Sequence, residues 1–158
     1  MIALAGVPVN RAAFLDMIAF SEIGTELLAK SDNGYDVLVG GTLFNGYADH
    51  PRQPIFLPKL GICSTAAGRY QLLARYFDDY KALLGLPDFS PDNQDAIALQ
   101  QIRESGLAMD MIDAGNLGGA IGLCAHLWAS LPGSCYGQPQ SETGALVAAY
   151  QASGGTLA

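Results

Sequence analysis

Apolar residues between positions 10 and 25 recur at the spacing of one helix face, which predicts an amphipathic helix. The apolar positions are Phe14, Met17 and Ile18. Asn10 is the expected N-cap, because its side chain can accept a hydrogen bond from a free helix amide, and Gly24 is the expected stop. At about 100° per residue, Glu22 falls on the apolar side of this helix, where a solvated carboxylate is unexpected.

Two effects would raise the pKa of Glu22. Partial burial disfavours its charged form, and the last turn of a helix carries partial negative charge. A raised pKa is what a general acid working near neutral pH requires. The alternative that the local pattern leaves open is a side chain that bends out to solvent beyond the helix end.

Residues 35–47 have the pattern of two short extended stretches. Residues 37–39 and 42–44 are rich in strand formers, and the two glycines at 40–41 are a turn signal. These stretches predict a small antiparallel sheet or wing, after a polar connector. The proline-punctuated residues 48–64 are predicted to form a loop.

Five more helical segments are predicted downstream. They run from Ser64 or Thr65 to Leu84, from Pro91 to about Ser105, from Met109 to Asp113, from Asn116 to Ser130, and from a cap at Ser141 to Gly154. The predicted fold class is therefore α+β, mainly helical, with a small antiparallel sheet flanking a substrate cleft. We expect one domain over residues 1–158, with Glu22 at the rim of that cleft.

Composition narrows the function. The net charge of −7 disfavours binding to nucleic acid or to an anionic membrane. The mildly apolar residues 1–9 lack a basic region and are too short to span a bilayer, so we expect neither an export signal nor a membrane anchor. With no metal-ligand cluster and no phosphate loop in the sequence, no metal and no cofactor are expected.

The three cysteines are neither clustered nor spaced like zinc ligands. They are Cys63, Cys124 and Cys135. Free thiols, in a protein made in a reducing cytoplasm, are the favoured reading. One disulfide with a spare thiol is the alternative.

Six stretches then point to a family. They are R-A-A-F-L-D-M-I-A-F-S-E at 11–22, N-G-Y-D-V-L-V-G-G-T-L-F at 33–44, Y-A-D-H-P-R at 47–52, G-R-Y-Q-L-L at 68–73, D-F-S-P-D-N-Q-D-A-I-A-L-Q-Q-I at 88–102 and L-W-A-S-L-P-G-S-C-Y-G-Q at 127–138. In this order and at this spacing, they resemble the lambda-type phage endolysins, a lysozyme-like family of peptidoglycan lytic transglycosylases.

The chain departs from the family pattern in a few places. The family has glycine directly after the Ser-Glu pair, whereas Ile23 precedes Gly24 here. Phe20 and Phe77 stand where the family has tryptophans, which would thin a sugar-facing aromatic surface. The acidic balance is also unexpected for a protein that meets an anionic cell wall.

The resemblance implies cleavage of the β-1,4 bond between N-acetylmuramic acid and N-acetylglucosamine. Glu22 would act first as acid and then as base, giving a 1,6-anhydro product without a second carboxylate. The first alternative is a hydrolytic lysozyme, which would need a second carboxylate such as Asp36 or Asp49. The alternative for Asp36 is a strand-end residue that hydrogen-bonds the backbone. The second alternative is a glycan-binding protein whose site is disabled.

Substrate-binding residues follow from the same resemblance. They are Asp36, Gly68, Tyr70, Gln71, Tyr136 and Gln138. Gly68 would let a sugar approach the backbone, and Gln71 would hydrogen-bond an acetamido or hydroxyl group; the alternative places Tyr70 in the core. Tyr136 and Gln138 would form a second wall of the binding site. The alternative is that Tyr136 only anchors its loop. Trp128 is expected in the core.

The family also implies partners and location. The expected partner is the peptidoglycan glycan strand, bound by a monomer. The protein would accumulate in the host cytoplasm and would act on the wall from the periplasm, after a holin-type lesion permeabilises the membrane.

Overall fold

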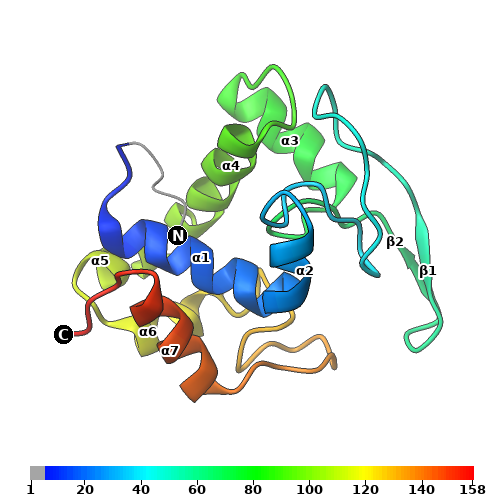
Figure 1. Ribbon diagram of the computed structural model, residues 1–158. Helices are drawn as coiled ribbons and strands as arrows, with labels where there is room; N and C mark the ends of the chain where they lie inside the picture. Colours follow the sequence, from blue (N-terminus) through cyan, green and yellow to red (C-terminus); the bar gives the residue numbers. More distant parts are fainter. Residues whose placement is uncertain (1–5) are drawn as a thin grey trace. The chain divides into compact units, whose positions relative to one another are not determined.

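The computed structural model describes residues 6–158, which are mostly helical with one two-stranded antiparallel sheet (Figure 1). This confirms the predicted α+β class. The described chain forms two compact units: the first unit comprises residues 6–22 and 98–158, and the second unit comprises residues 23–97. The single domain over 1–158 stays a prediction, and the first five residues of the apolar N-terminal segment lie outside the described residues.

The helices and strands follow in chain order. They are α1 (Val9–Ile23), α2 (Thr25–Lys30), β1 (Ile55–Leu57), β2 (Ile62–Ser64), α3 (Ala74–Leu84), α4 (Pro91–Arg103), α5 (Ala108–Asp113), α6 (Leu117–Cys124) and α7 (Thr143–Ala152). The boundaries between the two units fall near the end of α1 and within α4. The short helix α2 lies where the sequence predicted a polar connector.

The first helix has the predicted buried face but not the predicted cap. Phe14, Met17 and Ile18 are fully buried. Asn10 lies inside α1, and its amide donates to the carbonyl of Ile112 at 3.2 Å while its Oδ1 accepts from the backbone N–H of Thr156 at 3.0 Å. The prediction of Asn10 as N-cap is therefore wrong, because its side chain joins α1 to α5 and to the C-terminal segment.

The sheet lies later in the chain than predicted. Residues 37–44 form a tight turn with an isolated antiparallel bridge, Val37 opposite Leu43, and Leu38 forms a second isolated bridge with Ala67. The two strands instead fall in the predicted loop, with Phe56 opposite Cys63. The reason is visible in the sequence, because Pro54 and Pro58 flank the strand-forming run 55–57 rather than interrupting it.

Helix ends set by glycine or by a local cap agree with prediction better than the others. Gly85 ends α3 in the left-handed conformation, with φ +63°, and the side chain of Asn116 caps α6 by accepting from the Gly119 N–H. Three boundaries were wrong. Helix α3 begins at Ala74 instead of Ser64 or Thr65, α6 ends at Cys124 instead of Ser130, and α7 begins after Glu142 instead of Ser141.

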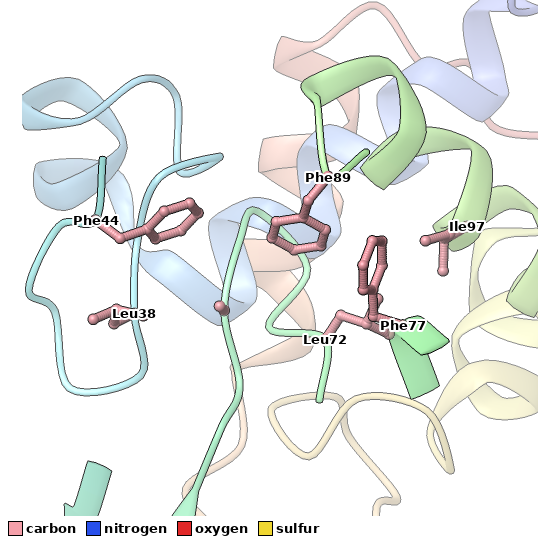
Figure 2. Close-up of a cluster of buried hydrophobic side chains, with 7 residues drawn as sticks. Leu38, Phe44, Leu72, Phe77, Phe89 and Ile97 are labelled. Carbon is pink, nitrogen blue, oxygen red and sulfur yellow. The ribbon is translucent and has the colours of Figure 1, made fainter. Parts of the chain in front are cut away.

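A cluster of buried apolar side chains holds the second unit together (Figure 2). Its members are Leu38, Phe44, Ala67, Leu72, Phe77, Phe89 and Ile97. The rings of Phe77 and Phe89 meet edge to face at 5.0 Å, and the buried ring of His50 lies 4.8 Å from Phe89. Phe77 is thus a core residue with no exposed surface, so the expectation that it belongs to a sugar-facing aromatic surface is wrong.

Candidate active site

Glu22 is the penultimate residue of α1 and is half-buried. The Ser130 hydroxyl donates to its Oε1 at 2.5 Å. Burial raises the pKa of the Glu22 carboxyl above its usual range, and hydrogen bonds from Ser130 oppose that rise. The direction of the shift is the one expected from the sequence, and the side chain does not bend away into solvent. Glu22 therefore has the environment of a general acid.

Ile23, expected to disturb the presentation of Glu22, is accommodated by the helix. Ile23 is the last residue of α1, and Gly24, with φ +82°, makes the turn into α2. A Cβ placed on Gly34 would lie 3.2 Å from Cγ1 of Ile23 and 3.0 Å from Cδ2 of Leu28. Ile23 is therefore packed within the second unit, directly after Glu22 in the chain.

Ser130 is a hydrogen-bond partner of Glu22 that the sequence analysis does not predict. It follows the buried Trp128, which lies in the core as predicted. The sequence feature that could have indicated Ser130 is the L-W-A-S-L-P-G stretch, in which the pattern predicts this serine as the end of a helix. Because α6 ends at Cys124, Ser130 lies in the following irregular segment and reaches Glu22.

Tyr70 belongs to a buried polar cluster in the second unit. Its side chain is 5% exposed, and its hydroxyl donates to Oδ1 of Asp95 at 2.6 Å. The Tyr35 hydroxyl donates to the same carboxylate at 3.0 Å, and the Arg69 guanidinium lies 5.2 Å from the Tyr35 ring. Burial raises the pKa of Asp95 to about 6. This position favours the core alternative for Tyr70.

Gly68 lies beside this cluster, and its backbone lies close to buried side chains of the second unit. Its φ is +79°, and an added Cβ would lie 2.2 Å from Oε1 of Gln94 and 2.9 Å from Cζ of Phe89. Gln71 follows with φ +51°, and its side-chain amide donates to the Gly68 carbonyl at 3.0 Å. Gln71 is half-buried, so of the three predicted binding residues in 68–71 it has the most accessible side chain.

Asp36 has backbone partners on both sides. Its Oδ1 accepts from the Asp32 N–H at 2.9 Å, and its carbonyl accepts from the Phe44 N–H at 2.9 Å. These hydrogen bonds favour the alternative for Asp36, a residue that hydrogen-bonds the backbone at a strand end. Asp49, the other acid considered, is paired with Arg52, whose Nε donates to it at 2.7 Å.

Tyr136 and Gln138 are exposed in the segment between Leu131 and α7. The Tyr136 hydroxyl donates to the carbonyl of His126 at 2.5 Å, as a loop anchor would, while 56% of the residue is exposed. With Glu22, these two residues belong to the first unit. Asp36, Gly68, Tyr70 and Gln71 belong to the second.

Residues 6–158 contain no group of three or more His, Cys, Asp or Glu side chains that could hold a metal ion. The three cysteines are free thiols, with Cys63 and Cys135 exposed and Cys124 buried. Within the same described range, no helix combines the length and the apolar character that a membrane crossing needs.

Solved structures share this fold. The chain matches the structure of bacteriophage lambda lysozyme complexed with a chitohexasaccharide, with a TM-score of 0.90 and 48% identity over 98% of this chain and 100% of that one. A second structure of lysozyme from bacteriophage lambda gives a TM-score of 0.85 and 49% identity at the same coverage. The fold is therefore that of a lysozyme-like enzyme.

Curated relatives narrow this class to a family. The chain is 54% identical to the endolysin of Escherichia phage lambda over 150 residues, covering 94% of this chain and 93% of that one. It is 44% identical to the endolysin of Escherichia phage P2, covering 94% and 95%. The endolysin family model matches residues 12–157. The chain therefore belongs to the endolysin family, phage enzymes that degrade the peptidoglycan of the bacterial cell wall.

Proposed function

We propose that this chain is a lytic transglycosylase that cleaves the β-1,4 bond between N-acetylmuramic acid and N-acetylglucosamine in peptidoglycan. The observation that carries the proposal is Glu22, a half-buried carboxyl at the end of α1 whose pKa is raised by burial and whose Oε1 is held by Ser130. A carboxyl with a raised pKa is protonated more of the time near neutral pH, as a general acid must be.

In the first step, Glu22 donates its proton to the glycosidic oxygen as the bond from C1 to that oxygen breaks. The acetamido oxygen of the muramic residue stabilises the oxocarbenium-like centre. In the second step, the Glu22 carboxylate takes the proton of the muramic 6-hydroxyl while O6 attacks C1. The product is the 1,6-anhydro sugar, Glu22 regains its proton, and no water is consumed.

The partners of the other acids support a single catalytic carboxyl. Asp36 accepts from the Asp32 N–H, and Asp49 is paired with Arg52. An ion pair with Arg52 lowers the pKa of Asp49 to about 2, which suits a structural anion. A transglycosylase needs no second acid, whereas a hydrolytic lysozyme would have to recruit one.

Substrate recognition is proposed for the more accessible of the predicted residues. The Gln71 amide, the Tyr136 ring and Gln138 are assigned to the glycan strand, and Asp36, Gly68 and Tyr70 are assigned to the local fold of the second unit around Gln71. A bound chitohexasaccharide in the matched lambda lysozyme supports a glycan as the ligand. We also assign a monomer that is made in the host cytoplasm and reaches the wall after holin-type permeabilisation.

The test uses purified murein and two matched variants. Glu22→Gln removes the acid, while Glu26→Gln changes an exposed glutamate that pairs with Lys30 on α2. We expect the parent and Glu26→Gln to release muropeptides about 18 Da lighter than hydrolytic products, and Glu22→Gln to be about 10²–10⁴-fold slower. Full-mass reducing ends in mass spectrometry would refute transglycosylation in favour of hydrolysis. Binding to murein without release by the parent would identify a glycan-binding protein instead.

A further inference from the structure

Three serine hydroxyls form a continuous hydrogen-bonded chain that ends on Glu22. Ser130 Oγ donates to Oε1 of Glu22 at 2.5 Å, and Ser21 Oγ donates to Ser130 Oγ at 2.7 Å. Ser141 Oγ lies 2.9 Å from Ser21 Oγ. A hydroxyl has a single proton, and that of Ser21 is directed to Ser130, so Ser141 is the donor in the outermost bond.

The chain joins three segments of the first unit. Ser21 precedes Glu22 on α1, Ser130 lies after α6, and Ser141 lies just before α7. The backbone N–H of Ser141 donates to the carbonyl of Ser130 at 2.7 Å, which fixes the two segments to each other. All three serines are half-buried, so water competes only partly for their hydroxyls.

We infer that Ser130, Ser21 and Ser141 act as one directional positioning unit that keeps Oε1 of Glu22 as an acceptor and leaves the acid's proton to Oε2. The inference rests on the proposed role of Glu22 as the single acid and base. To place a proton on Oε1 in line with Ser130, the Ser130 hydroxyl would have to turn away, and the two hydroxyls behind it would have to turn as well.

Hydroxyls suit an acid that later becomes a base. A lysine or arginine in place of Ser130 would stabilise the carboxylate so strongly that the acid would lose its proton, whereas a neutral hydroxyl stabilises it only modestly. Each further hydroxyl polarises the next and strengthens its donation, by roughly 10–30% per bond. Ser21 and Ser141 thereby tune the proton affinity of Glu22 without touching it.

Charged neighbours do not account for the same effect. Glu142, next to Ser141, and His126, four residues before Ser130, are both exposed. Burial raises the pKa of Glu22 and hydrogen bonds from Ser130 oppose that rise, and neither Glu142 nor His126 contributes to the shift.

The direct test is a ¹³C NMR titration of the glutamate side-chain carboxyls. The chain has only four glutamates, at positions 22, 26, 104 and 142, so Glu22→Gln assigns the signal of Glu22. We expect Ser21→Ala to raise the pKa of Glu22 by roughly 0.2–0.7 pH unit, with a smaller rise in Ser141→Ala.

Two control variants distinguish this effect from general damage. Ser134→Ala removes a hydroxyl that donates to the Ala129 carbonyl and does not belong to the row of three serine hydroxyls. This variant should leave the pKa of Glu22 unchanged. Ser21→Thr keeps a hydroxyl and should hold the parental value. Ser21→Ala should also lower kcat on murein glycans more than it changes KM, because it disturbs the proton and not the binding surface.

An unchanged pKa of Glu22 in both Ser21→Ala and Ser141→Ala would overturn the inference. If Ser21→Ala does not fold, Ser141→Ala decides alone, because Ser141 lies outside the helices, just before α7. Full activity of Glu22→Gln would instead defeat the proposed function, and the titration reports on the serines independently of that outcome.

Discussion

Replacing Gly68 by alanine should destabilise the protein far more than its backbone angle alone explains. At φ +79°, an alanine is strained by about 1–2 kcal/mol. The added methyl group would also lie 2.2 Å from Oε1 of Gln94 and 2.9 Å from Cζ of Phe89, both in buried residues. Overpacking of a core typically costs about 1–3 kcal/mol.

The Gln94 side chain cannot yield without losing hydrogen bonds. Its Oε1 accepts from the Arg69 N–H at 2.9 Å, and its amide donates to the carbonyls of Phe89 and Tyr35 at 2.9 and 3.1 Å. Leaving one buried partner unsatisfied costs about 1–3 kcal/mol. We therefore expect Gly68→Ala to lower the free energy of unfolding by about 3–5 kcal/mol, a large part of the total for a domain of this size.

Gly46 provides the matched control. Its φ is also +79°, but an added Cβ would have nothing within 4 Å. Urea and thermal unfolding of the two variants should show Gly46→Ala losing only the strain, about 1–2 kcal/mol. Equal losses in Gly68→Ala and Gly46→Ala would refute the packing argument. A small loss with a large rise in KM would assign Gly68 to the substrate instead.

Two buried titratable groups should give opposite pH dependences of stability, both measured by urea unfolding from pH 4 to 8. Burial lowers the pKa of His50, whose Nδ1 accepts from the Arg52 N–H, so its contribution is present above about pH 6.5 and is lost as the pH falls. A His50→Leu variant should be less stable at pH 8 and should lack this loss of stability at low pH. A parental dependence of stability on pH in His50→Leu would be inconsistent with a role for His50. Asp95, with its pKa raised from 3.8 to about 6, contributes stability that is complete below about pH 4 and is lost as the pH rises to about 6. Asp95→Asn should remove this loss, and a parental pH profile in Asp95→Asn would contradict it.

Features controlled by neighbouring residues could be read from the sequence. Gly85 and Asn116 act on the helix ends beside them, and both behave as predicted. The apolar face of α1 follows from spacing alone, and it carried the expectation that Glu22 is at least partly buried. Resemblance to the family supplied the proposed reaction and the acid-then-base role of Glu22, which no local rule could give.

Features that depend on distant partners could not be read this way. Asn10 and Ser141 both have the side chains of helix caps, yet each bonds a partner at least 100 residues away: Asn10 bonds Ile112, and Ser141 bonds Ser21. A capping residue and a tertiary hydrogen-bonding residue have the same local sequence signature. The Ser130 contact with Glu22 was missed for a similar reason, because it depends on where α6 ends.

The 68–71 stretch shows why a shared motif does not by itself identify a substrate contact. Gly68 packs against Gln94, and the Tyr70 hydroxyl bonds Asp95, so the stretch fits two neighbouring residues of α4. Those partners lie within another stretch that resembles the family, 88–102. The fold alone therefore requires the pairing of the two stretches. Gln71 differs, because its half-buried side chain donates to the backbone carbonyls of Gly68 and Val37 and not to α4, so the pairing of the two stretches does not account for it.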